Sequence, residues 1–81
     1  MKIIPSKKLF WFLKDGVELD VSQPAVLEMY VQQVVSTGRT EDVKFLLSNL
    51  KNEEFKHAFS KIKRFLPWEV RTFWEDFFVN H

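Results

Sequence analysis

The sequence predicts an all-α fold, a compact bundle of about five short helices formed by one domain over residues 1–81. The chain has only 2 Gly and 3 Pro, which favours helices joined by short connections. Apolar residues recur at three- and four-residue spacing over most of its length, as expected for helices with one buried face. Aromatic residues make up 16% of the chain, and such large side chains help a small domain to bury enough surface.

The first predicted helix spans about residues 6–13. Ser6 has the side chain of a good N-cap, and Asp15 with Gly16 supplies turn chemistry after the helix. Residues 17–21 then alternate apolar and polar side chains, which is the pattern of a strand. Because the sequence shows no partner strand, we expect an extended connection there.

Three further helices are predicted in the middle of the chain. One begins near Ser22, tolerates Pro24 in its first turn, and ends at Gly38 in a left-handed C-cap. Thr40 is the predicted N-cap of the next helix, and Asn52 is the predicted N-cap of the one after it. Helical spacing assigns to the buried faces Leu27, Tyr30, Val31, Val34, Val43, Leu46, Leu47, Phe55, Ala58, Phe59 and Ile62.

The last predicted helix begins at Pro67, a position where the missing N–H costs least. Its wide apolar stripe consists of Val70, Phe73, Trp74, Phe77 and Phe78. This concentration of large side chains predicts that the C-terminal aromatic helix is the central packing element of the bundle.

The composition and motifs argue against several classes of function. With 12 basic and 11 acidic residues the net charge is +1, which is too balanced for a strong field toward nucleic acid or membranes. The chain has no cysteine and no apolar run approaching the length of a membrane span, so we expect a cytoplasmic protein. It lacks a nucleophile elbow, a phosphate-binding loop and a zinc-protease motif, which predicts a protein that is not an enzyme and needs no cofactor.

The two histidines do not indicate a metal site. His57 follows Glu53 by four residues, so the two can share a helix face, and His81 is the last residue of the sequence. Two ligands do not make a zinc site, which normally needs at least three protein ligands. We therefore predict no bound metal.

The surplus of aromatic residues is the best indication of function. Three consecutive rings, Phe10, Trp11 and Phe12, would span about 200° of a helix, so one face cannot bury all of them. Trp68 also lies off the main stripe of its helix. One interpretation is that a small core wraps all these rings. The other, which we adopt as the functional hypothesis, is an exposed aromatic surface that binds a protein partner or a second copy of the chain, with Phe10, Trp11 and Trp68 as its candidate residues.

DNA binding is the alternative hypothesis. The two helices predicted within residues 40–64 are joined by a short turn, as in a helix-turn-helix pair. The later part of this region is basic and contains Lys56, Lys61, Lys63 and Arg64. However, Glu53 and Glu54 would occupy the first turn of the recognition helix, where they would face phosphates, so a solvated helix face is the stronger interpretation.

The order of short motifs resembles a family of uncharacterised small helical proteins of bacteria and archaea. The matching segments are Leu9-Phe10-Trp11, Leu19-Asp20, Tyr30-Val31, Val34-Val35, Gly38, Glu41-Asp42 and Phe73-Trp74. The resemblance implies a single helical domain without catalytic residues. Some members of that family are encoded beside nucleotidyltransferase-type toxin genes, which implies an antitoxin-like or accessory role. The chain departs from the family pattern at Gln33, where the family has a basic residue, and at Arg71 and Thr72.

Overall fold

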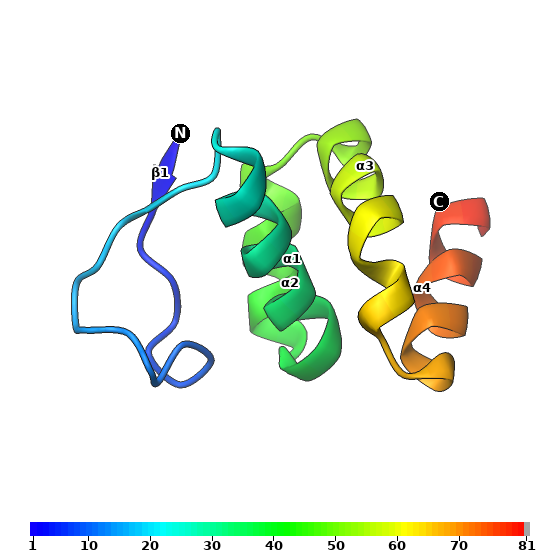
Figure 1. Ribbon diagram of the computed structural model, residues 1–81, viewed down its shortest axis with the longest axis horizontal. Helices are drawn as coiled ribbons and strands as arrows, with labels where there is room; N and C mark the ends of the chain where they lie inside the picture. Colours follow the sequence, from blue (N-terminus) through cyan, green and yellow to red (C-terminus); the bar gives the residue numbers. More distant parts are fainter. Residues whose placement is uncertain (81) are drawn as a thin grey trace.

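The computed structural model describes residues 1–80, in which four α-helices follow a small two-stranded ladder (Figure 1). The elements are β1 (Lys2–Ile3), β2 (Leu19–Asp20), α1 (Pro24–Thr37), α2 (Thr40–Asn49), α3 (Asn52–Ile62), the 3-10 turn η1 (Lys63–Phe65) and α4 (Trp68–Asn80). The all-α class is confirmed at this level, because helices form most of the molecule. The described part has four α-helices and not about five, because the first predicted helix does not form.

Residues 6–13 form successive turns and not a helix. The N–H groups of Leu9 and Phe10 both donate to the carbonyl oxygen of Ser6, at 3.2 and 2.9 Å. The strand pattern at residues 17–21 does have a partner: β2 pairs antiparallel with β1, with Ile3 opposite Leu19. The turns between the strands are held by contacts with α1, because the Leu9 carbonyl oxygen accepts from the Gln33 side chain and the Phe10 ring packs on Tyr30.

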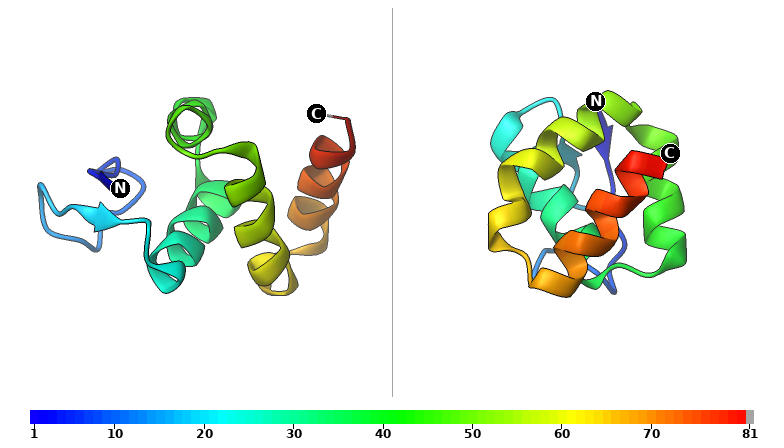
Figure 2. Two further views of the ribbon diagram at one scale, coloured as in Figure 1. Left: turned by 90° about the horizontal axis from the view of Figure 1, so that it is seen from above. Right: turned by 90° about the vertical axis from the view of Figure 1, so that its right-hand side faces the viewer.

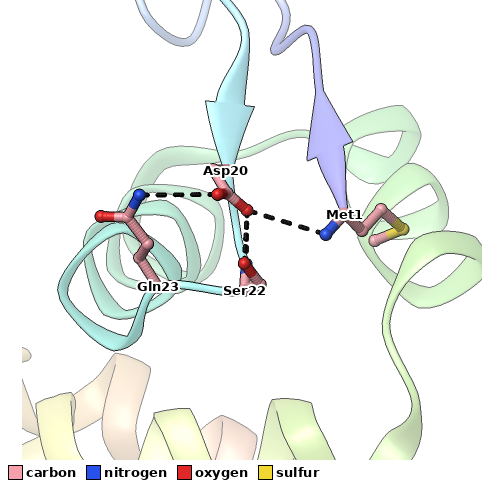
Figure 3. Close-up of polar contacts among 4 residues, drawn as sticks. All are labelled: Met1, Asp20, Ser22 and Gln23. Atoms are coloured by element: carbon pink, nitrogen blue, oxygen red, sulfur yellow. Dashed lines mark hydrogen bonds and ion pairs between the residues drawn. The ribbon is translucent and has the colours of Figure 1, made fainter.

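Asp20 closes the end of this ladder and leads the chain into α1 (Figure 3). Its Oδ1 accepts hydrogen bonds from the hydroxyl of Ser22 at 2.6 Å and from the Ser22 backbone N–H at 3.1 Å. The amino group of Met1 lies 3.7 Å from the same oxygen. These donors, the Ser22 hydroxyl foremost, hold the pKa of Asp20 below its usual value. The N-cap of α1 is Gln23, one residue after Ser22, near which the helix was predicted to begin, and Ser22 completes the turn around Asp20.

The N-caps of α2 and α3 also differ from the predicted residues. Thr40 and Asn52 are the first helical residues, and Arg39 and Lys51 precede them as N-caps. In each helix the acid at the third position accepts a hydrogen bond from the N-cap backbone N–H: Asp42 from Arg39, and Glu54 from Lys51, both at 2.9 Å. In both helices the carboxylate at the third position bonds to the N-cap backbone, in place of the capping by the Thr40 hydroxyl and the Asn52 amide that the sequence predicted.

The central helix is α1 and not the C-terminal helix. It contacts α2, α3, α4 and β2, and its buried residues are Tyr30, Val31, Val34 and Val35. Figure 1 shows α4 at one end of the long axis, beside α3, and the N-terminal segment at the other end. Among the residues of α4 only Trp74 is fully buried, and Phe73 is 63% exposed. The predicted central role of α4 is wrong because an edge helix buries only one face.

Gly38 does not adopt the predicted left-handed conformation, since its φ is −70° and its ψ is 153°. Its N–H donates to the carbonyl oxygen of Val34 at 2.8 Å, and a Cβ at this position would overlap that same oxygen. Glycine is thus required at the end of α1 by a close approach between backbone segments.

We therefore expect Gly38→Ala to lower the free energy of unfolding by about 1–3 kcal/mol, because the backbone must shift to make room for the methyl group. Urea denaturation followed by circular dichroism measures this change. Thr37→Ala, at the exposed neighbouring position, serves as the control and should stay within about 0.5 kcal/mol of the parent. A Gly38→Ala protein as stable as the parent would show that the close approach does not constrain this turn.

Candidate functional site

A groove of about 840 Å³ lies between the N-terminal segment and the helices α1 and α2. We call it the Trp11 groove. One wall consists of residues 4–11, and the other consists of side chains from the second half of α1 and the start of α2. It contains Phe10 and Trp11, two of the three aromatic residues that the sequence indicated as a binding surface.

Two contacts hold the N-terminal wall against α1. The side-chain amide of Gln33 donates to the carbonyl oxygen of Leu9 at 3.0 Å. The ring of Phe10 stacks on the ring of Tyr30 with centroids 5.9 Å apart and an interplanar angle of 16°. Phe10 is therefore only 1% exposed, so its ring presents almost no surface to a partner, in contrast to the exposed aromatic surface that was expected to include it. Trp11, the next residue, is 72% exposed at the groove.

Tyr30 forms part of the buried floor of the groove, since it lines the cavity while only 2% of the residue is exposed. Within residues 1–80 the Tyr30 hydroxyl has no hydrogen-bond partner. It is not among the fully buried polar atoms, so it is accessible from the groove. Burial, together with the nearby negative charge of Asp42, raises the pKa of Tyr30 to about 12. The hydroxyl therefore stays protonated well above neutral pH.

The rim of the groove carries charges of both signs. Lys7 forms an ion pair with Asp15 at 3.2 Å and donates a hydrogen bond to the carbonyl oxygen of Leu13. Within the described part of the chain, Lys8, Arg39 and Glu41 form no ion pair and are exposed at the rim. The groove is therefore polar at its edge, and its exposed rings are those of Trp11 and Phe45.

Trp68, the third candidate aromatic, lies far from this groove. It is the first residue of α4 and is 66% exposed. The views in Figure 2 place α4 and the N-terminal segment at opposite ends of the molecule. Phe73 is also exposed on α4, beside a second groove of about 510 Å³ between α4 and the ends of α1 and α2. Trp11 and Trp68 thus belong to two separate surfaces.

The basic residues proposed for DNA contact lie on α3 and η1, and part of their charge is engaged. Lys63 pairs with Glu75 of α4 at 3.4 Å, and the guanidinium of Arg64 lies 4.8 Å from the centre of the Phe65 ring. Lys56 and Lys61 are exposed. The helices α2 and α3 are joined by only Leu50 and Lys51, a connection as short as the DNA-binding hypothesis supposed.

Sequence reasoning assigned Tyr30 to the core, and it gave neither Asp42 nor Gln33 a role in binding. The structure places all three at the groove. A tyrosine on the buried face of a helix can indicate a binding site, because its hydroxyl needs a hydrogen-bond partner even where its ring belongs to the core. Nothing in the sequence shows that Gln33 and Asp42 line the same groove as Tyr30.

Within residues 1–80, no group of three or more His, Cys, Asp or Glu side chains is placed to hold a metal ion. The same residues include no helix with the length and apolar character needed to cross a membrane. His57 is exposed on α3, and His81 lies outside the described residues.

Comparisons with protein-family models, with curated proteins and with solved structures found no match to this chain. The resemblance to the small helical family of bacteria and archaea therefore rests on the short sequence motifs alone.

Proposed function

We propose that this protein is a non-enzymatic protein–protein interaction module whose binding surface is the Trp11 groove. The observation that carries the proposal is the position of Trp11: an indole that is 72% exposed stands beside a groove of about 840 Å³. Tryptophan is enriched among the residues that dominate binding energy at interfaces. Exposing so large an apolar side chain to water is unfavourable, and burial against a partner's surface would be favourable in free energy.

The neighbourhood of Trp11 supports this proposal. Phe12 and Ile4 are also exposed on the N-terminal segment, and Phe45 is exposed on the opposite wall. An apolar centre surrounded by the charged side chains of Lys8, Arg39 and Glu41 matches the usual anatomy of an interface, in which a polar rim encloses an apolar centre.

An antitoxin-like or accessory role is the specific form of the proposal that the motif resemblance suggests. In that role the partner is a protein encoded beside this one, and the cytoplasm is where the two would meet. A homodimer formed through the same surface is the other form of the proposal.

We expect Trp11→Ala to reduce recovery of the partner at least about tenfold, because truncating a central interface tryptophan commonly costs about 2 kcal/mol or more. The measurement is co-expression with the product of the neighbouring gene, followed by affinity capture and light scattering. The matched control is Trp68→Ala, which removes an equally exposed indole at the other end of the molecule and should leave recovery unchanged. A Trp11→Ala protein that binds normally, or a parent that stays monomeric and binds nothing, would contradict the proposal.

A small DNA-binding regulator is the second candidate, favoured by the two-residue connection between α2 and α3. We expect any binding to its own promoter region to weaken steeply with salt, and to be lost in the double variant Lys61→Glu with Arg64→Glu. Fluorescence anisotropy over a salt series provides the measurement. Binding that this double variant leaves unchanged would exclude the basic stretch as the contact.

A further inference from the structure

Three polar side chains of the Trp11 groove are buried or half-buried and can still accept hydrogen bonds, namely Tyr30, Gln33 and Asp42, whereas the donors of Lys8 and Arg39 are exposed at its rim. The amide nitrogen of Gln33 is committed to the carbonyl oxygen of Leu9 at 3.0 Å, which leaves its Oε1 as an acceptor. Asp42 is half-buried, and one of its two carboxylate oxygens accepts the Arg39 backbone N–H at 2.9 Å. Its other oxygen has no partner within residues 1–80.

Tyr30 adds a hydroxyl to these acceptors. It is the most deeply buried polar group that lines the groove, and nothing in the described part of the chain bonds to it. A hydroxyl oxygen can accept two hydrogen bonds. Asp42 is the charged group whose field acts on this hydroxyl, and it is less exposed than Lys8 and Arg39 at the rim.

Within residues 1–80, no cationic side chain bonds to the Tyr30 hydroxyl, the free Asp42 oxygen or the side-chain oxygen of Gln33. A guanidinium supplies five donors in a rigid plane and can bond to several acceptors at once, whereas an ammonium is a compact charge that holds its water more strongly. The planar guanidinium also stacks on aromatic rings, and the exposed rings of Trp11 and Phe45 stand at the two walls.

On this basis we propose that the Trp11 groove binds an arginine side chain presented by the partner polypeptide. The guanidinium bonds to the Asp42 carboxylate, the Gln33 carbonyl and the Tyr30 hydroxyl, and the partner's backbone crosses the rim beside Trp11. This proposal rests on the proposed function, because the arginine belongs to the protein that the module binds. Lys8 and Arg39 at the rim favour acidic residues on either side of that arginine and disfavour a uniformly basic segment.

A titration with blocked pentapeptides tests this proposal directly. The probe has arginine at its centre and glycine elsewhere, and matched peptides carry lysine, citrulline or glutamate in its place. Two-dimensional NMR of the parent protein follows the Gln33 side-chain amide, the Trp11 indole N–H and the backbone amide of Asp42. We expect the arginine peptide to shift these signals, and the citrulline peptide, which has the same shape without the charge, to bind at least about tenfold more weakly.

Variants of the floor residues locate the contact. Asp42→Asn should raise the dissociation constant of the arginine peptide about tenfold, and Tyr30→Phe should raise it several-fold while keeping the buried ring. Tyr30→Phe should keep the native fold, because the Tyr30 hydroxyl bonds to nothing in the described part of the chain. Glu69→Gln on α4 is the control and should bind as the parent does. Each variant is checked by its NMR spectrum for the native fold.

Equal binding of the arginine and citrulline peptides would overturn the proposal, as would tight binding of the glutamate peptide with shifts centred on Lys8 and Arg39. If no arginine peptide binds but Trp11→Ala still loses the partner, the arginine assignment fails and the proposed function stands. If the arginine peptide binds but Trp11→Ala keeps the partner, the proposed function fails instead.

Discussion

Replacing Trp74 by alanine should lower the free energy of unfolding by about 3–5 kcal/mol, the usual cost of truncating a buried tryptophan. Trp74 is the one fully buried residue of α4, and its ring packs edge-on against Phe55 of α3 at 5.5 Å between centroids. Its indole N–H also donates to the carbonyl oxygen of Val35 on α1 at 3.2 Å. The single side chain therefore joins three helices, and its loss leaves both a cavity and an unpaired buried carbonyl.

The measurement is guanidinium denaturation followed by circular dichroism, with Trp68→Ala as the matched control on the same helix. Trp68 is exposed, so its removal should change the free energy of unfolding by less than about 0.5 kcal/mol. Because small domains have a total stability of about 5–15 kcal/mol, the Trp74→Ala protein could be largely unfolded at room temperature. Equal stability of the two variants would show that α4 does not depend on this anchor.

A comparable loss, about 3–5 kcal/mol, is expected when alanine replaces Phe10. Phe10 belongs to a segment without regular helix, yet it is as buried as the core of the helices, and it stacks on Tyr30 of α1. Without its ring, the N-terminal segment loses its most deeply buried side chain and keeps the Gln33 contact, the two-residue ladder and smaller buried side chains such as Ile3 and Leu9.

The control for this prediction is Phe12→Ala, which removes a ring that is exposed on the same segment. We expect it to stay within about 0.5 kcal/mol of the parent. Thermal unfolding by calorimetry and amide hydrogen exchange of residues 1–21 distinguish a global loss of stability from local release of the segment. A Phe10→Ala protein that melts as the Phe12→Ala protein does would exclude Phe10 as part of the core.

The helices were predictable because their apolar spacing is regular, but the residues that start and stop them were predicted less well. Thr40 and Asn52 have side chains suited to capping, and the acids two positions beyond each of them reach back to the preceding residue instead. Gly38 marks the end of α1 as predicted, but it does so by a close backbone approach that sequence cannot show. Sequence preferences predict where a helix ends better than they predict which contacts end it.

The wrong predictions at the two ends of the chain both concern tertiary contacts that a local sequence pattern does not contain. The β1–β2 pairing involves two residues on each strand, which is too short for an alternating pattern to reveal both partners. At the other end, Phe73 and Trp74 are neighbours on α4 and point about 100° apart, so an edge helix can bury only one of them. Which one is buried depends on where the helix docks, and that is a tertiary property.

The candidate site was predictable only in part. The structure exposes Trp11 while it buries Phe10, but the helix argument does not explain this, because residues 6–13 form turns and not a helix. The acceptors of the groove come from residues 30, 33 and 42, and their convergence with residues 4–11 depends on the docking of a non-helical segment. No local pattern encodes that docking.

The two walls of the Trp11 groove come from parts of the chain that should fold at different stages. Residues 24–80 are helices joined by short connections, whereas the N-terminal segment has no helix of its own and is fixed by a two-residue ladder and by its contacts with α1. The N-terminal segment is therefore the part expected to detach first and reattach last. A ligand that bridges both walls binds only while this segment is in place, so its affinity includes the equilibrium of docking, and its presence slows hydrogen exchange in residues 1–21. Occupancy of the groove would then be readable in amides that the ligand never touches.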